Sequence, residues 1–201
     1  EYVRVDGLQI KLSTTWAATY PAGVIFGVNT ASSDMRISNN IIQADVSSLT
    51  GGGGMGINDN GWASCAGTKR IWNNIIYQSP ASSYFSGFNA YGGTAYVYNN
   101  TINGVSTAYQ QQGGTVLVKN NVAMNNTTDY NGTFSASSTN NQSEDGTAPD
   151  TNERTCAVSF VNAVGFDFHV AGADTCAKNQ GADLSADDNL PFSTDIDGEA
   201  R

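Results

Sequence analysis

Apolar and polar residues alternate along several short segments, and each of these segments ends at a pair of asparagines. In four of them an apolar residue stands two positions before the pair, at Ile37, Ile71, Val97 and Val118. The positions just before these, which would face the other way, are held by Arg36, Arg70, Tyr96 and Leu117. A period of two residues indicates a strand with one buried face. No segment has the period of an amphipathic helix, so the pattern predicts short strands joined by turns.

The asparagine pairs themselves form a repeat. They are Asn39-Asn40, Asn73-Asn74, Asn99-Asn100, Asn120-Asn121 and, more weakly, Asn140-Asn141. Their first members are separated by 34, 26, 21 and 20 residues. A second motif, a small residue followed by an apolar residue and an amide, precedes the pairs at Gly27-Val28-Asn29, Gly56-Ile57-Asn58, Gly87-Phe88-Asn89 and Ala108-Tyr109-Gln110. Two motifs that share a period near 21, with inserts of variable length, are typical of a solenoid.

Each coil is expected to contain three strands. The first ends at the amide triplet, the second ends just before the asparagine pair, and the third begins just after it. Asparagine tolerates the left-handed backbone angles of a sharp bend better than other non-glycine residues. In coils stacked about 4.8 Å apart, its amides can also bond to one another as a ladder. The sequence therefore predicts an all-β solenoid, a parallel β-helix with an inward asparagine ladder.

With these motifs, the chain resembles the right-handed parallel β-helix superfamily, the pectate-lyase-like solenoids. The resemblance covers about residues 3–143, with residues 3–8 as a first coil. The runs at residues 167–170, 181–184 and 194–199 are similar to the end of bacterial secreted β-helix proteins with variable surface anchors. The resemblance implies one domain of right-handed coils (1–143), an acidic, loop-rich closing segment (144–201) packed on it, and a secreted or cell-surface location in bacteria.

Charge is distributed unevenly between these two parts. Residues 1–143 contain six acids and six bases, whereas residues 144–201 contain twelve acids and three bases, which accounts for the net charge of −9. The basic surface that nucleic acids require is absent, so nucleic acid is not an expected partner. No apolar stretch is long enough for a membrane span. The chain begins at Glu1 without a signal peptide, and we expect it to be a mature or excised form.

The closing segment contains two further candidate features. The first is a group of hard oxygen ligands that could bind calcium, or that serve only solubility: Asp183, Asp187, Asp188, Asp195 and Asp197. The second is a disulfide between Cys156 and Cys176, which would stabilise a loop with little core of its own. Cys65 would then remain unpaired, and the single histidine, His169, is interpreted as structural.

The first candidate binding surface is the column of amides at the ends of the first strands. Its members are Asn29, Asn58, Asn89 and Gln110, with Gly27, Gly56, Gly87 and Ala108 as a flat floor beside them. Amides both donate to and accept from hydroxyl groups, so such a strip suits an extended polysaccharide. The alternative is that these amides form a second stacked ladder.

The second candidate surface lies on the second strands. Arg4, Arg36 and Arg70 are expected to align, followed by Tyr96, beside a column with Trp72, Tyr98 and Lys119. Arginine next to aromatic rings could bind a charged sugar chain, and Trp72 and Tyr98 are its candidate contacts. The alternative is an ordinary exposed strand surface.

Three functions remain open at this point. The first is polysaccharide binding without catalysis. The second is a polysaccharide lyase or glycoside hydrolase, although Asp59 and Asp129 would lie about 14 Å apart by coil spacing, too far for a glycosidase pair, so catalytic groups would come from the insert 59–70 or the closing segment. The third is a stalk that associates end to end, because no polar cap is evident before the first coil.

Overall fold

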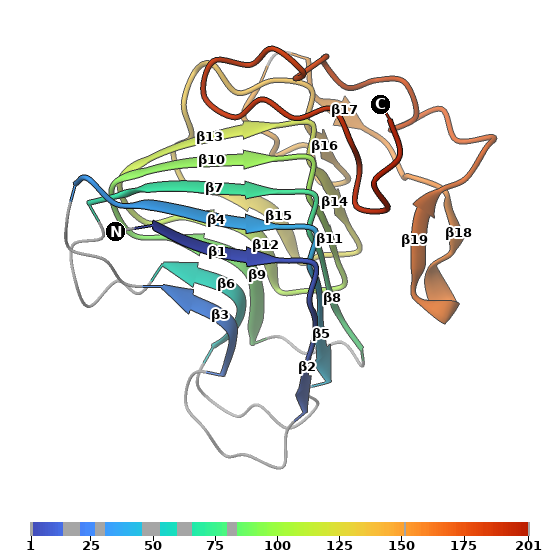
Figure 1. Cartoon of the computed structure of the whole chain (residues 1–201). Coiled ribbons are helices and arrows are strands. Elements are labelled where there is room, and N and C mark those ends of the chain that lie inside the picture. The colour runs from blue at the N-terminus through green and yellow to red at the C-terminus, as the bar shows by residue number, and fades with distance from the viewer. Residues whose placement is uncertain are drawn as a thin grey trace.

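The computed structural model describes residues 2–13, 21–26, 31–45, 53–59, 66–79, 84–150 and 152–200, and within these ranges the strands form three parallel sheets that wind around one axis (Figure 1). Sheet A has the order β1 (Tyr2–Asp6), β4 (Asp34–Ser38), β7 (Thr68–Trp72), β10 (Thr94–Tyr98) and β13 (Thr115–Lys119). Sheet B has the order β17 (Arg154–Thr155), β16 (Gln142–Ser143), β14 (Val122–Met124), β11 (Thr101–Asn103), β8 (Ile75–Gln78), β5 (Ile41–Asp45) and β2 (Gln9–Ser13). Sheet C has the order β15 (Thr128–Asn131), β12 (Thr107–Gln111), β9 (Phe85–Ala90), β6 (Gly54–Asp59) and β3 (Ala22–Phe26). The predicted fold, a parallel β-helix with three short strands per coil, is confirmed.

The register of sheet A follows the sequence repeat. Ile37 pairs with Ile71, Ile71 with Val97, and Val97 with Val118, and all four are buried. The outward arginines Arg4, Arg36 and Arg70 also align, as predicted. Because a shift of one residue would move the whole apolar series to the outside, this pattern fixes the register.

The asparagine pairs perform two different tasks. The first member of each pair turns the chain, with φ of 54–57° at Asn39, Asn73, Asn99, Asn120 and Asn140. The second member is buried and donates its Nδ2 to the Oδ1 of the next: Asn40 to Asn74 at 2.9 Å, Asn74 to Asn100 at 2.9 Å, Asn100 to Asn121 at 3.1 Å, and Asn121 to Asn141 at 3.0 Å. The inward asparagine ladder is therefore confirmed.

The ladder has a direction and both of its ends are satisfied. At one end the Oδ1 of Asn40 accepts the backbone N–H of Leu8 at 3.0 Å. At the other end Asn141 donates its Nδ2 to the carboxylate of Asp150 at 2.8 Å. A carboxylate only accepts hydrogen bonds, so Asp150 terminates a series in which every earlier amide is both donor and acceptor.

The core fills the space between the three sheets. Phe85 and Phe88 from β9 are almost completely buried, and Tyr109 stacks on Tyr130 with ring centroids 4.8 Å apart. At the N-terminal end of the described stack, Tyr2 is 60% exposed and Leu8 is 49% exposed. End-to-end association through this coil stays a prediction.

The first part of the closing segment belongs to the stacked coils, and the rest packs against their outer surface. Its strand β17 extends sheet B beyond residue 143 by pairing with β16. It continues into the antiparallel hairpin of β18 (Phe160–Asn162) and β19 (Asp167–Val170), joined by a 3₁₀ turn at Ala163–Gly165. The hairpin projects to one side, and the last part of the chain runs along the edge where sheets A and B meet (Figure 1). The described residues include no helix with the length and hydrophobicity needed to cross a membrane.

Candidate functional site

The amide column on sheet C is present over four coils. Asn58 pairs with Asn89, Asn89 with Gln110, and Gln110 with Asn131. In the first coil, however, Ile25 occupies this column, because β3 aligns Val24 with Ile57 and Ile25 with Asn58. The described strand therefore places no amide at this end of the column, and Asn29 lies outside the described residues.

Gly56 and Gly87 do not form an outward floor, which corrects the second part of this prediction. A Cβ at Gly23, Gly56 or Gly87 would lie 2.6–2.8 Å from the side chain of an isoleucine of sheet B. The isoleucines are Ile42, Ile76 and Ile102, respectively. These glycines face the core, where only a hydrogen leaves room for the opposite sheet. This packing also explains the register of β3, since Gly23 lies against Ile42.

A column of small polar residues lies beside the amides on the outer face of sheet C. Ser86, Thr107 and Thr128 align with one another and are half-buried, and Met55 extends the column at one end. The face therefore presents hydroxyl groups next to amides.

Asn89 is less accessible than predicted, since only 2% of it is exposed. Its Nδ2 donates to the hydroxyl of Tyr91 at 3.3 Å, and Gln112 donates to the same hydroxyl at 3.1 Å and to the Oδ1 of Asn89 at 3.3 Å. Asn89 therefore positions Tyr91 and Gln112 and is not itself an open contact. Tyr91 lies two residues after Asn89, and this spacing in the strand pattern was the available signal that it shares the same face.

The other amides on this face differ in how accessible they are: Gln112 and Asn131 are exposed. Gln110 is half-buried, and Asn58 has an Oδ1 that is shielded and accepts no hydrogen bond from the described residues. The accessible polar groups of the face are thus Gln110, Gln112 and Asn131, together with the ring of Tyr91.

The carboxylates next to this face are buried and fully engaged. Asp59 is completely buried and forms an ion pair with Lys69, which is also completely buried, at 2.5 Å, while accepting the N–H of Tyr91 at 2.8 Å. Asp129 accepts the N–H of Glu144 at 2.6 Å and the hydroxyl of Ser143 at 3.0 Å. Burial raises the pKa of both carboxyl groups. Neither carboxylate is open to a substrate, and the described strands of sheet C carry no other acid or base.

The arginine strip on sheet A is balanced by an acid that the sequence analysis did not consider. Asp34 accepts from Arg36 at 2.9 Å and from Arg70 at 2.6 Å. Partial burial opposes the effect, but these hydrogen bonds and charges prevail and lower the pKa of Asp34. The stacked arginines therefore have a partner within their own sheet.

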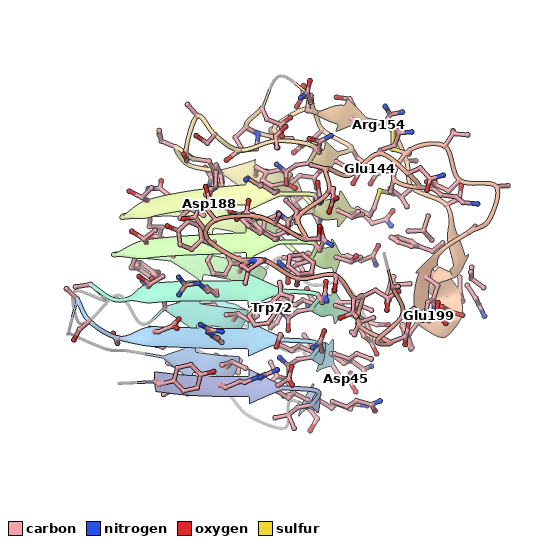
Figure 2. All side chains as sticks on the ribbon, turned by 45° about the horizontal axis from the view of Figure 1, so that its top comes forward. Asp45, Trp72, Glu144, Arg154, Asp188 and Glu199 are labelled. Carbon is pink, nitrogen blue, oxygen red and sulfur yellow. A yellow bond between two sulfur atoms is a disulfide. The ribbon has the colours of Figure 1, made fainter. Side chains whose placement is uncertain are left out.

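The aromatic column beside the arginines is covered by the closing segment. Tyr98 is completely buried and packs in one cluster with Leu184 and Leu190, so its predicted role as a sugar contact is wrong. Trp72, labelled in Figure 2, is half-buried and faces Phe192 with ring centroids 6.5 Å apart. Lys119 forms an ion pair with Asp187 at 2.6 Å. At Trp72, Tyr98 and Lys119, the surface predicted for a charged sugar is an internal contact between the coils and their closing segment.

The five aspartates proposed for calcium are distributed along the closing segment rather than gathered. Asp187 binds Lys119, Asp183 accepts the N–H of Ser185 at 2.9 Å, and Asp195 accepts the N–H groups of Asp197 and Glu199. Asp188, labelled in Figure 2, is exposed. Within the described residues no three His, Cys, Asp or Glu side chains are arranged to hold a metal ion. These aspartates therefore form no common site, and calcium binding stays a prediction.

A disulfide and a histidine with two aspartate partners stabilise the closing segment. A disulfide joins Cys156 to Cys176, whereas Cys65 lies outside the described residues. His169 is 60% exposed and contacts Asp167 through Nδ1 at 2.5 Å and Asp197 through Nε2 at 2.8 Å. It connects the hairpin to the last described turn.

The His169 link is expected to weaken as pH rises. The hydrogen bond to Asp167, and then that to Asp197, raise the pKa of His169. Its contribution is therefore complete below the ordinary histidine pKa of about 6.5 and is lost as pH rises through the higher pKa of the folded state. We expect amide hydrogen exchange at residues 197–199, corrected for intrinsic rates, to accelerate between pH 5 and pH 9. His169→Gln should remove this pH dependence, and an unchanged dependence in that variant would contradict the assignment.

Comparisons of the chain with protein-family models, with curated proteins and with solved structures found no match.

Proposed function

We propose that the chain binds an extended, uncharged polysaccharide along the outer face of sheet C and does not cleave it. The observation that carries this proposal is the pair of aligned columns on that face, amides on one side and the hydroxyl groups of Ser86, Thr107 and Thr128 on the other. Successive strands place equivalent groups about 4.8 Å apart. A polymer that lies across the coils therefore meets hydroxyl groups on three successive strands, and accessible amides at Gln110 and Asn131.

The chemistry of the face favours a neutral sugar chain. Its amides and hydroxyl groups can donate to and accept from hydroxyls, and Tyr91 adds an aromatic ring that is held in place by Asn89 and Gln112. The adjacent carboxylates, Asp59 and Asp129, are buried and engaged. These features support binding over a lyase or hydrolase activity. Membership of the pectate-lyase-like solenoids, and a secreted or cell-surface role in bacteria, belong to the same proposal.

The proposal is tested by electrophoresis in gels that contain a neutral or an acidic polysaccharide. We expect retardation by the neutral polymer, and at least tenfold weaker binding when Gln110→Ala is combined with Gln112→Ala, because two of the three accessible amides of the face are lost. Gln43→Ala is the matched control, since Gln43 is a half-buried glutamine on the face of sheet B. Retardation by acidic polymers alone, or new reducing ends in either polymer, would overturn the proposal.

A further inference from the structure

The outward asparagines at the bends hold the closing segment by its backbone. Asn120 forms a two-way pair with Ala182: its Nδ2 donates to the carbonyl oxygen at 2.9 Å, and its Oδ1 accepts the N–H at 2.8 Å. Asn140 donates to the carbonyl oxygen of Gln180, and Asn73 to that of Thr194, each at 2.9 Å. At each of these three bends of the asparagine column, the Nδ2 thus donates to a backbone carbonyl oxygen of the closing segment.

Asn99, which lies between Asn73 and Asn120 in this column, is the exception. The closing segment leaves the column after Ala182, crosses sheet A with Leu184 and Leu190 against Tyr98, and returns at Thr194. The Oδ1 of Asn99 is shielded from solvent and accepts no hydrogen bond from the described residues. A buried carbonyl oxygen without a donor costs about 1–3 kcal/mol, so this bend lacks a partner that its neighbours have.

A cavity of about 590 Å³ lies beside Asn99, between sheet B and the closing segment. One wall is the aligned series Thr101, Val122, Gln142 and Arg154. The facing wall includes Phe192 and Ser193. Arg154, labelled in Figure 2 near the end of the stack, has an Nε that is also shielded and without a partner among the described residues. The volume is within the range of about 300–1,000 Å³ that is usual for small-ligand sites.

We propose that this cavity binds an N-acetylated sugar residue, whose acetamido carbonyl oxygen accepts from Asn99 as the backbone carbonyl oxygens of Gln180, Ala182 and Thr194 accept from the other bends. The side-chain amide of Asn99 turns towards the cavity, so that its Nδ2 donates to the ligand carbonyl oxygen and its Oδ1 accepts from a neighbouring ring hydroxyl. Thr101, Ser193 and Arg154 are available to the ring hydroxyls, and Val122 and Phe192 to its apolar face.

An extended peptide also carries secondary amides, but it fits this cavity less well. The strands that form the wall, β11 and β14, are already paired on both sides. A peptide that adds to a sheet needs a free edge for its successive backbone groups, and here it would find a single amide partner. A sugar residue with one acetamido group and several hydroxyls matches one amide surrounded by side-chain donors. The site is separate from the outer face of sheet C and does not depend on the function proposed for that face.

The test is a calorimetric titration of the whole chain with N-acetylglucosamine, with glucose as the matched sugar that lacks the amide. We expect N-acetylglucosamine to bind at least tenfold more tightly than glucose, and Asn99→Gly to remove this preference. Glycine keeps the bend because it adopts positive φ without strain. Asn125→Gly is the control, since Asn125 has φ of 56° but does not line the cavity. Asn99→Asp, which cannot donate, should also weaken binding and covers the case in which the glycine variant folds poorly.

Three results would overturn the inference. They are equal binding of the two sugars, unchanged binding in both Asn99 variants, and tighter binding of N-acetylglycine N-methylamide than of N-acetylglucosamine, which would assign the cavity to a peptide. Retardation by a neutral polymer without acetamido groups should be the same in Asn99→Gly and in the unmodified chain. This comparison distinguishes a failure of the inference at Asn99 from a failure of the function proposed for sheet C.

Discussion

Replacing Lys69 with methionine is expected to lower the free energy of unfolding by about 3–5 kcal/mol, which is the usual cost of breaking a buried ion pair from one side. Lys69 occupies an inward column of sheet A, between Met35 and Ala95. Methionine fits such a position by size, but it leaves the carboxylate of Asp59 in the core without its cation. The loss is measured by equilibrium unfolding in urea.

The cost of Lys69→Met should depend on pH. Burial already raises the pKa of Asp59, and Lys69 acts in the opposite direction, so removing the lysine raises that pKa further. A carboxyl group whose pKa is higher in the folded than in the unfolded state destabilises the fold as pH rises. The difference between variant and unmodified chain should therefore be smaller at pH 4 than at pH 8.

Two further variants isolate the buried charge as the cause. Adding Asp59→Asn to Lys69→Met should restore much of the stability, because asparagine keeps an oxygen for the N–H of Tyr91 and carries no charge. Lys11→Met breaks an exposed pair with Asp45, with the lysine side chain 56% exposed, and should cost below about 1 kcal/mol. Equal losses of unfolding free energy for Lys69→Met and Lys11→Met would show that the buried pair contributes no more to stability than an exposed one.

Replacing Asn100 with leucine is expected to cost roughly 2–6 kcal/mol, because at least two buried groups lose their partners at about 1–3 kcal/mol each. The Oδ1 of Asn100 accepts both the N–H and the Nδ2 of Asn74, and its own Nδ2 donates to the carbonyl oxygens of Ile71 and Tyr98. Leucine is similar in volume but replaces none of these bonds. Equilibrium unfolding in urea again gives the measurement.

The adjacent residue supplies a matched control for the ladder. Asn99 is also an asparagine of the same pair, but its Oδ1 accepts no hydrogen bond from the described residues, and its φ of 54° suits glycine. Asn99→Gly should therefore change stability by less than about 1 kcal/mol. If the two variants were equally destabilised, the contribution would come from the bend rather than from the ladder.

The coil architecture could be predicted from the sequence because the signals for it are local and repeated. The two members of each asparagine pair differ in role, yet both roles follow from neighbours one coil away, and the period makes those neighbours visible. The same period-two pattern that places Ile71 inside also places Lys69 inside. The buried position of Lys69 could therefore have been predicted from the sequence by following the alternation two residues back from Ile71.

The candidate sites were harder to predict because they depend on contacts between distant segments. Gly23-Val24 is followed by Ile25 rather than by an amide, so the triplet motif favours Gly27-Val28-Asn29, and only the space beside Ile42 selects Gly23. The burial of Tyr98 depends on Leu184 and Leu190, more than 80 residues later in the chain. No repeat connects such partners, so the sequence pattern contains no information about them.

The two ends of the asparagine ladder have a consequence for the length of the protein. Every internal rung offers a donor to one neighbour and an acceptor to the other, so each coil interface is chemically the same as the next. Only Asp150 breaks this equivalence, because it accepts without donating. A duplicated coil, such as a second copy of the 21 residues from Asn99 to Lys119, could thus be inserted without creating a new kind of junction. Coil number can change by gene duplication upstream of Asp150, and each added coil would lengthen the outer face of sheet C by about 4.8 Å.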